Sequence, residues 1–388
     1  MDTTTRPPAP PRIPLLDVLR GFAILGTLAM NIWLFGYPES GGYGPVAEGL
    51  RSMFVDGKFF AMLTLLFGVG LAIQYRAAAE RGHSRPSKQI WRALLLLVEG
   101  ALHVVLLFAW DVLMGYAITA LLVVYVLGLS ERTRSAVMWT ALGLHLTFVG
   151  SVTALTTLFF PVVHRQSPPM QTEEGQLYLE GSYTDQVLYR ATDFLDSRVT
   201  VLHTFPLMVF LFLFGVRLYR AGAFGDDRVG RALRSRMTVW GLGLGLPLNA
   251  LPTVWHDDSL LLIGNRVFSV VLMLGYVGLV GLLMDRVRRT GLVTVSLTAV
   301  GRTALSCYIL QNLLASVLFY DWGLGLAAHA HHAGWMVAAW AVISLVMVAG
   351  SRWWLSRFAR GPMELLQTWI LARVPEGRPS SSPPPVRK

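Results

Sequence analysis

Apolar tracts of about the length that a membrane-crossing helix needs, roughly 20 residues, follow one another along the chain. Short polar segments separate them, and the ninth tract contains Gly301 and Arg302, where we expect a kink or break. This pattern predicts an all-α, polytopic bundle of about ten transmembrane helices. The predicted spans are 15–36, 58–76, 90–110, 112–129, 135–160, 200–220, 236–253, 260–284, 293–320 and 334–355.

A polar stripe runs down the first of these tracts. Asp17, Arg20, Thr27 and Asn31 are spaced by three, seven and four residues, which places them on one face of a helix. Ionisable residues inside a membrane are costly and face a bundle interior or a cavity. The stripe therefore indicates a polar site within the bundle. At the inner end of the helix, the simplest interpretation is that Asp17 and Arg20 pair with each other.

Lysine and arginine positions predict the orientation of the bundle. With the N-terminus in the cytoplasm, the basic clusters at 76–92, 132–134, 217–236 and 286–289 all fall in inner loops, and 357–373 follows on the same side. We therefore predict that both termini are cytoplasmic. These basic residues would anchor the inner loops at an anionic membrane leaflet. They account for the net charge of +10 without a nucleic-acid partner.

The composition also fits a membrane protein. Hydrophobic residues make up 54% of the chain and charged residues 14%, with a mean hydropathy of +0.51. A soluble domain carries about 25% charged residues. The single cysteine, Cys307, excludes an intrachain disulfide and argues against a thiolate metal site, and we expect no bound metal.

One transmembrane domain is predicted over 13–373. The Pro-rich segment 1–12 and the Pro/Ser-rich segment 374–388 are predicted to be disordered, and the first helix lacks a signal-peptide cleavage site. The extracytoplasmic loop 160–199 either covers an external mouth or is a solvated connector. The stretch after Pro362 is predicted to anchor the chain at the inner interface.

Candidate chemistry centres on the third tract. Glu99, His103 and Asp111 are spaced by four and eight residues, so a continuous helix brings them to one face. A histidine oriented by a carboxylate is the usual arrangement of a general base. The alternative is a polar cluster that packs helices together.

Further polar residues fall at a similar depth and together indicate a hydrated cavity open to the outside. Individually, each is typical of a rim anchor. Arg302 lies nearer the middle of its span and needs a carboxylate partner or an anionic ligand. The residues at the outer depth are Asn31, Lys58, Tyr116, His203, Asn265, Arg266, Gln311 and Asn312.

Several segments resemble the YeiB family, whose C-terminal half, here 200–373, is known as domain of unknown function 418. The similar segments are LLDVLRGFAILGTLAMN, GKFFAMLTLLFGVGLAI, EGALHVVLLFAWDVLMGYAI, GRTALSCYILQNLLASVLFYDWGLGL and SRFARGPMELL. The family is grouped with transmembrane acyltransferases that move an acyl group from cytosolic acyl-CoA to an acceptor on the far side.

The resemblance implies roles for particular residues. Asp17, Arg20 and Asn31 match the motif of the first helix, His103, Asp111 and Tyr116 match the middle segment, and Arg302, Tyr308 and Gln311 match the late motif. Some branches of the superfamily have a catalytic histidine where this chain has Asn31, so His103 is the first choice of base and His203 the second. Trp110 replaces a usual glycine, and Leu365 and Gln367 replace usual tryptophans.

The resulting hypothesis is acyl transfer in a bacterial plasma membrane. Acyl-CoA is expected as a co-substrate and not as a permanently bound cofactor. Arg20 would bind its phosphates, His103 with Glu99 or Asp111 would deprotonate a small-molecule, glycan or lipid acceptor, and Asn31 with Tyr116 would stabilise the oxyanion. Membrane lipid and a second copy of the chain are the other expected partners. The alternatives are a secondary transporter of a polar or amphipathic molecule and a non-catalytic scaffold.

Overall fold

The computed structural model describes residues 13–36, 43–80, 87–159, 173–195, 198–255, 258–286, 291–330 and 332–374. The part of the chain within these ranges is helical and contains no strand, as the sequence predicts. The tails predicted to be disordered, apart from residue 374, lie outside the described residues, as does 160–172 of the predicted outer loop.

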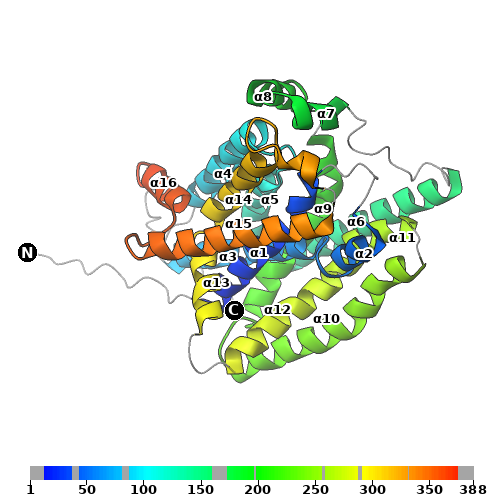
Figure 1. The fold of residues 1–388 in the computed structure, drawn as a ribbon. Coiled ribbons are helices and arrows are strands. Elements are labelled where there is room, and N and C mark those ends of the chain that lie inside the picture. Colours follow the sequence, from blue (N-terminus) through cyan, green and yellow to red (C-terminus); the bar gives the residue numbers. More distant parts are fainter. Residues whose placement is uncertain are drawn as a thin grey trace, which may run out of the picture.

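Figure 1 shows the arrangement of the helices, whose bounds follow in chain order. They are α1 (Pro14–Asn31), η1 (Ile32–Leu34), α2 (Pro45–Phe54), α3 (Lys58–Glu80), α4 (Ser87–Leu106), α5 (Leu113–Leu127), α6 (Glu131–Phe159), α7 (Glu173–Glu180), α8 (Tyr183–Thr192), α9 (Val199–Arg220), α10 (Arg228–Trp255), α11 (Asp258–Ile263), η4 (Gly264–Phe268), α12 (Ser269–Arg286), α13 (Leu292–Arg302), α14 (Ala304–Phe319), η5 (Leu326–His329), α15 (Ala333–Leu355) and α16 (Pro362–Leu371).

Each apolar tract of the sequence forms a helix or a pair of helices. In the described residues, six helices are long and apolar enough to cross a membrane, and a seventh crossing results if α13 and α14 form one bent span. Helix α5 is apolar but has only 15 residues. The structure thus contains the helices of a multispan membrane protein, while ten crossings and cytoplasmic termini stay predictions.

Glycines let the central helices approach closely. A Cβ on Gly21 of α1 would lie 2.0 Å from the Leu297 carbonyl oxygen of α13, and one on Gly68 of α3 would lie 2.1 Å from the Phe212 oxygen of α9. Small residues have this function at helix interfaces in membranes, where apolar burial gives little driving force. The centre of the bundle is therefore fixed by backbone-to-backbone packing of these pairs.

Helices α10 and α12 form a long pair along one side of the bundle (Figure 1). A Cβ on Gly241 would lie 2.2 Å from the backbone nitrogen of Gly275. At one end of the pair, the Arg234 guanidinium forms two hydrogen bonds to Asp285 Oδ2, at 3.2 and 2.8 Å, and one to Oδ1, at 2.9 Å. This ion pair, in which the arginine is buried and the aspartate is accessible to solvent, links α10 to α12.

The tract at 293–320 is broken, as its Gly301–Arg302 pair predicts. Helices α13 and α14 meet at an angle of 89°, with Thr303 between them. The exposed backbone of α14 is capped from a distance, because Glu364 Oε1 of α16 accepts the N–H of Leu305 at 2.9 Å. Helix α16 is thereby attached to the bend.

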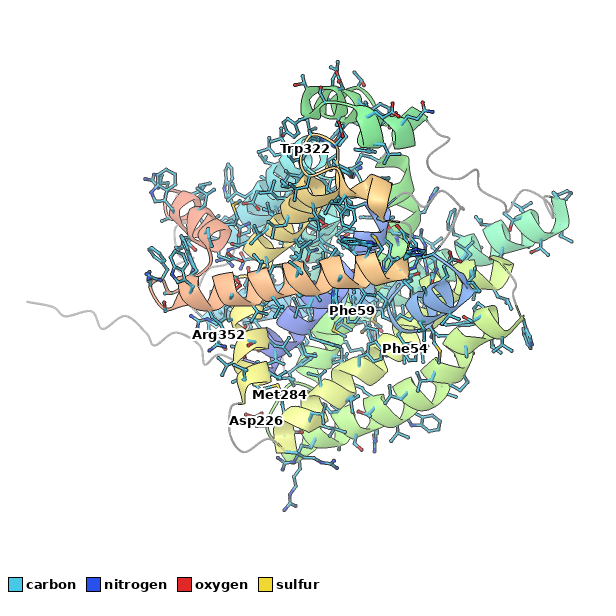
Figure 2. All side chains as sticks on the ribbon, in the orientation of Figure 1. Phe54, Phe59, Asp226, Met284, Trp322 and Arg352 are labelled. Atoms are coloured by element: carbon cyan, nitrogen blue, oxygen red, sulfur yellow. The ribbon has the colours of Figure 1, made fainter. Side chains whose placement is uncertain are left out.

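The small helices α7 and α8 lie at one end of the bundle (Figure 1). Arg190 of α8 donates to the carbonyl oxygens of Val105 and Leu106 at the end of α4. Figure 2 shows Trp322 beside α8, with Arg352 and Met284 on the opposite side of the molecule. The end with α8 is the one that the basic loops predict to be extracytoplasmic, and it is called the outer end below.

Candidate functional site

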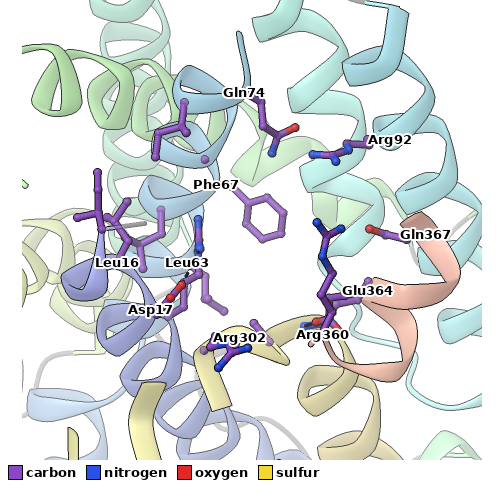
Figure 3. Close-up of a pocket in the computed structure, with 18 of the residues that line it drawn as sticks. Leu16, Asp17, Leu63, Phe67, Gln74, Arg92, Arg302, Arg360, Glu364 and Gln367 are labelled. Atoms are coloured by element: carbon purple, nitrogen blue, oxygen red, sulfur yellow. Dashed lines mark hydrogen bonds and ion pairs between the residues drawn. The ribbon is translucent and has the colours of Figure 1, made fainter. Parts of the chain in front are cut away.

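A cavity of about 740 Å³ opens at the inner end, among α1, α3, α4, α14 and α16. Five arginines line it, against three carboxylates. Figure 3 shows Arg92, Arg302 and Arg360 around this space, with the Phe67 ring in its middle. The cationic residues are Arg20, Arg76, Arg92, Arg302 and Arg360, and the acidic ones are Asp17, Glu80 and Glu364.

The acidic residues of this inner cavity are already engaged. Asp17 lies 3.3 Å from Arg20, and Glu80 lies 2.8 Å from Arg76. Glu364 is occupied by the backbone and hydroxyl of α14. The inner cavity therefore keeps an excess of positive charge that suits an anionic ligand.

Two tyrosines line the inner cavity from the bundle interior, Tyr116 of α5 and Tyr308 of α14. The Tyr308 hydroxyl donates to Asp111 Oδ1 at 3.1 Å. The Tyr116 hydroxyl accepts from Thr64 at 3.3 Å. Both rings are buried. Tyr308 thus joins the inner cavity directly to a carboxylate in the interior.

Asp111 is the centre of a buried polar cluster. Its Oδ1 lies 3.0 Å from His103 Nδ1, and its Oδ2 accepts the N–H of Leu113 at 2.8 Å. On the other side of the imidazole, Asn312 Nδ2 lies 3.2 Å from Nε2. The side chains of His103 and Asp111 are only 2% and 0% exposed. We call His103, Asp111, Tyr308 and Asn312 the central wall.

The two ring nitrogens of His103 face different polar groups. Nδ1 lies beside the Asp111 carboxylate and Nε2 beside the Asn312 amide. A histidine flanked by polar groups on both sides has a defined ring orientation. The arrangement is the one that acid–base chemistry needs, and equally one that fixes three helices together.

A second cavity, of about 650 Å³, lies at the outer end on the other side of the central wall. It is lined by the Ala109–Val112 turn with Asp111 in it, by Tyr189 and Arg190 of α8, and by Arg266 of η4. The predicted outer loop therefore contributes directly to the lining of this outer cavity. Of the eight polar residues from which a hydrated outer cavity was predicted, Asn265 and Arg266 line this cavity.

Arg198 ties the outer cavity to the wall. Its guanidinium donates to the backbone oxygens of Asp111, at 3.3 Å, and of Ala109. Burial lowers the pKa of Arg198 below its usual value, while the nearby Asp111 charge opposes that shift. The turn that presents Asp111 is thus held by a cation from the start of α9.

The structure changes the expected geometry of the Glu99–His103–Asp111 face. Helix α4 ends at Leu106, so Asp111 lies in the following turn and reaches His103 because the chain folds back. Glu99 lies apart from this pair, since its Oε2 accepts from Gln367 of α16 at 2.7 Å. Of the two carboxylates proposed to orient His103, the geometry supports Asp111.

Other predicted residues lie away from the wall. The His203 ring is exposed and stacks on Phe148, with centroids 4.9 Å apart, so it is not placed as an alternative base. Lys58 is fully buried and donates to the Ser52 carbonyl, which is a structural contact. Asn31 is buried on α1 but is not among the residues that line either cavity.

The remaining predicted residues are divided between the two cavities and the interior. Arg20 and Arg302 line the inner cavity, where Arg302 donates to the Ala359 carbonyl at 2.9 Å. Arg266 lines the outer cavity. Gln311 is fully buried, and neither amide atom has a hydrogen-bond partner among the described residues.

Three contributors to the inner cavity were assigned to other roles from sequence. Arg92 and Arg360 fit the pattern of basic loop anchors, and α16 fits that of an interfacial anchor. No local signal separates an arginine that anchors a loop from one that turns into a cavity. Glu364, which lies in the GPME stretch of a segment that resembles the family, was the available sequence signal that α16 contributes to the inner cavity.

Fold and site together define a polytopic helical membrane protein with a cavity at each end and a buried aspartate–histidine pair between them. The family model described as "Protein of unknown function (DUF418)" matches residues 218–373. Over 92% of its length the chain is 28% identical to 93% of the uncharacterized protein YxaH of Bacillus subtilis (strain 168). Over 92% of its length it is 26% identical to 96% of the uncharacterized protein YeiB of Escherichia coli (strain K12). These matches support the YeiB/DUF418 family for this chain.

Proposed function

We propose that this protein is an integral membrane acyltransferase, which moves an acyl group from cytosolic acyl-CoA to a hydroxyl or amine acceptor at the outer face. The observation that carries the proposal is the hydrogen bond from Tyr308 to Asp111. Tyr308 lines the inner cavity and Asp111 the outer one, so a donor and an acceptor on opposite sides would meet at the same buried groups.

The inner cavity suits the donor. Guanidinium groups bind phosphate oxygens in a bidentate manner, and Arg92, Arg302 and Arg360 surround the space as coenzyme A phosphates would require. Deeper in the cavity, Leu63 and Phe67 provide an apolar lining for the pantetheine arm and the acyl chain. Acyl-CoA would act as a co-substrate that enters and leaves from the cytoplasm.

The central wall provides the chemistry. The acceptor O–H or N–H gives its proton to the Asp111–His103 pair, its oxygen or nitrogen bonds to the acyl carbon, and the C–S bond breaks to release the coenzyme A thiolate, which takes up a proton. Tyr116 would donate to the developing oxyanion, and so would Tyr308 once its hydrogen bond to Asp111 is broken, a contribution of about 10²–10³ in rate for one donor. Because the Asp111 side chain has no exposed surface, the wall must open for the substrates to meet.

Two histidine variants test this proposal. His103→Ala should abolish acyl-CoA-dependent release of free coenzyme A in membrane vesicles of the expressing cells, where the natural acceptors are present. His203→Ala is the matched control and should retain it, since that ring is exposed, stacks on Phe148 and lines neither cavity. Equal activity of the two variants, with both proteins inserted and folded, would exclude His103 from the reaction.

Binding of the donor is tested separately. Acetyl-CoA and longer acyl-CoAs at 100 times their Kd should stabilise the detergent-purified protein by about 2.7 kcal/mol, with adenosine nucleotides as controls. Arg360→Gln should reduce the shift, because it removes one cation of the inner cavity. Absence of a shift with every acyl-CoA would contradict the acyltransferase proposal.

A secondary transporter is the second candidate, favoured by the bend of 89° between α13 and α14 beside a closed wall. Broken helices near the midplane and two cavities that open alternately are typical of transporters. Accumulation of a labelled substrate in vesicles without any acyl-CoA requirement would favour this function. For either function we propose a bacterial plasma membrane as the location, since the relatives are bacterial proteins.

A further inference from the structure

The outer cavity contains more positive charge than its own carboxylates compensate. Four arginines line it, Arg51, Arg190, Arg198 and Arg266. Arg51 is paired with Asp56 at 3.0 Å. Arg198 is held by backbone oxygens and faces the charges of Asp111 and Asp193. The remaining two arginines, Arg190 and Arg266, form no ion pair with a carboxylate among the described residues.

Arg190 has one guanidinium nitrogen without a partner. Its side chain is buried, at 3% exposure for the residue, and its Nε and Nη2 donate to the carbonyl oxygens of Val105 and Leu106. Its Nη1 is buried and has no hydrogen-bond partner among the residues that the structure describes. The guanidinium carbon lies 5.9 Å from the centroid of the Tyr178 ring, so the charge of Arg190 is placed beside an aromatic face at the edge of the outer cavity.

Arg266 lies on the π-helical turn η4, where the helix widens beside the same cavity. No hydrogen bond or ion pair joins its guanidinium to any residue within the described ranges. Single π-turns are frequent at functional sites. Arg266 thus presents an unpaired guanidinium to a space of about 650 Å³, and Arg190 adds a second positive charge to its lining.

We infer that the outer cavity binds an acceptor with an oxyanion, a phosphate ester or a carboxylate, which the Arg266 guanidinium holds and the neighbouring charge of Arg190 attracts. Guanidinium groups match the planar and bidentate geometry of these oxyanions. Trp33, Trp110 and Tyr189 provide flat walls for the uncharged part of the molecule. The inference deepens the proposed function, because only an acyltransferase would use this ligand as an acceptor. The anion site itself is argued from the residues of the outer cavity alone.

Binding to the full-length, detergent-purified protein tests the inference. Glycerol 3-phosphate, glycerate and glycerol are compared by isothermal titration, in the presence of saturating coenzyme A to occupy the inner arginines. We expect an oxyanion probe to bind at least about tenfold more tightly than glycerol, as one charge-assisted hydrogen bond implies. Dihexanoyl phosphatidylglycerol is titrated as a further probe. Its affinity, compared with that of glycerol 3-phosphate, distinguishes a lipid headgroup from a soluble acceptor.

Matched variants locate the site. Arg266→Gln removes a charge but no structural hydrogen bond, and it should weaken oxyanion binding about tenfold or more, with partial recovery in Arg266→Lys. Arg360→Gln, in the inner cavity, should leave that affinity unchanged. Arg190→Gln should act like Arg266→Gln, although its fold is checked first because Arg190 also anchors α8.

Each outcome decides between site and function. Equal affinities for glycerol and the oxyanions, or loss of binding in Arg360→Gln but not in Arg266→Gln, would overturn the outer anion site. Failure of coenzyme A to bind, with oxyanion binding still dependent on Arg266, would overturn the acyltransferase proposal and leave the site standing.

Discussion

Replacement of Tyr308 by phenylalanine removes one atom from the point where the two cavities meet. The lost hydroxyl donates to Asp111 Oδ1 at 3.1 Å, in a region where both side chains are buried. Asp111 keeps its contact with His103 and the N–H of Leu113 on its other oxygen. The variant therefore weakens the wall without leaving the carboxylate unpartnered.

The size of the effect follows from the kind of bond. A hydrogen bond to a charged group contributes about 1.5–3 kcal/mol, and each 1.36 kcal/mol of barrier changes a rate tenfold. Loss of this bond, and of an oxyanion donor, should lower acyl transfer by about 10- to 100-fold or more. The affinity for acyl-CoA should change little, because the arginines of the inner cavity are untouched.

The assay compares Tyr308→Phe with Tyr276→Phe. Tyr276 also loses one hydrogen bond, to the Phe54 carbonyl at 3.1 Å, but it lines neither cavity. Release of coenzyme A in vesicles and the thermal shift with acyl-CoA are measured for both. If Tyr308→Phe retained the turnover of Tyr276→Phe, the reasoning that the wall carries the chemistry would be refuted.

Three further variants probe the frame around the site. Glu364→Ala removes the cap that α16 supplies to α14 and should weaken acyl-CoA binding about fivefold and speed proteolysis of the C-terminal helix, as measured by titration and limited digestion. Arg234→Met removes the hydrogen bonds to Asp285 and to the carbonyl oxygens of Ala223 and Gly225, and a hydrogen bond contributes about 0.5–3 kcal/mol, which a lower thermal midpoint would show. Gly301→Ala places a Cβ 1.8 Å from a backbone oxygen of α1 and should prevent accumulation of folded protein, whereas Gly143→Ala, which meets open space, should not; size-exclusion profiles of the two compare them.

The spans were predictable because an apolar tract of about 20 residues is a local property of the sequence. The break at Thr303 was predictable for the same reason, since Gly301 and Arg302 interrupt such a tract. The attachment of α16 was not. Its link to α14 depends on Glu364 and on Leu305, 59 residues earlier, and no periodicity within either helix reports that contact.

Within the site, the aspartate–histidine contact was predicted, but helical spacing is not its cause. Helix α4 ends at Leu106, and a backbone turn held by Arg198 returns Asp111 to His103. Glu99, at the spacing that a regular helix favours, turns instead to Gln367. Spacing identified the chemically plausible residues, while chain reversal and distant partners decided which of them meet.

Loosening the central wall affects the two candidate functions in opposite directions, which gives the Tyr308→Phe variant its value. In an acyltransferase the hydroxyl takes part in the reaction, so its loss lowers turnover even though substrates reach the wall more easily. In a transporter the bond from Tyr308 to Asp111 only holds the two cavities apart. Its loss would then lower the barrier to opening and raise the rate of substrate movement across vesicles. Slower release of coenzyme A with no flux supports transfer, and faster flux with no coenzyme A requirement supports transport, so the sign of the change separates the two functions where the static arrangement of the cavities fits both.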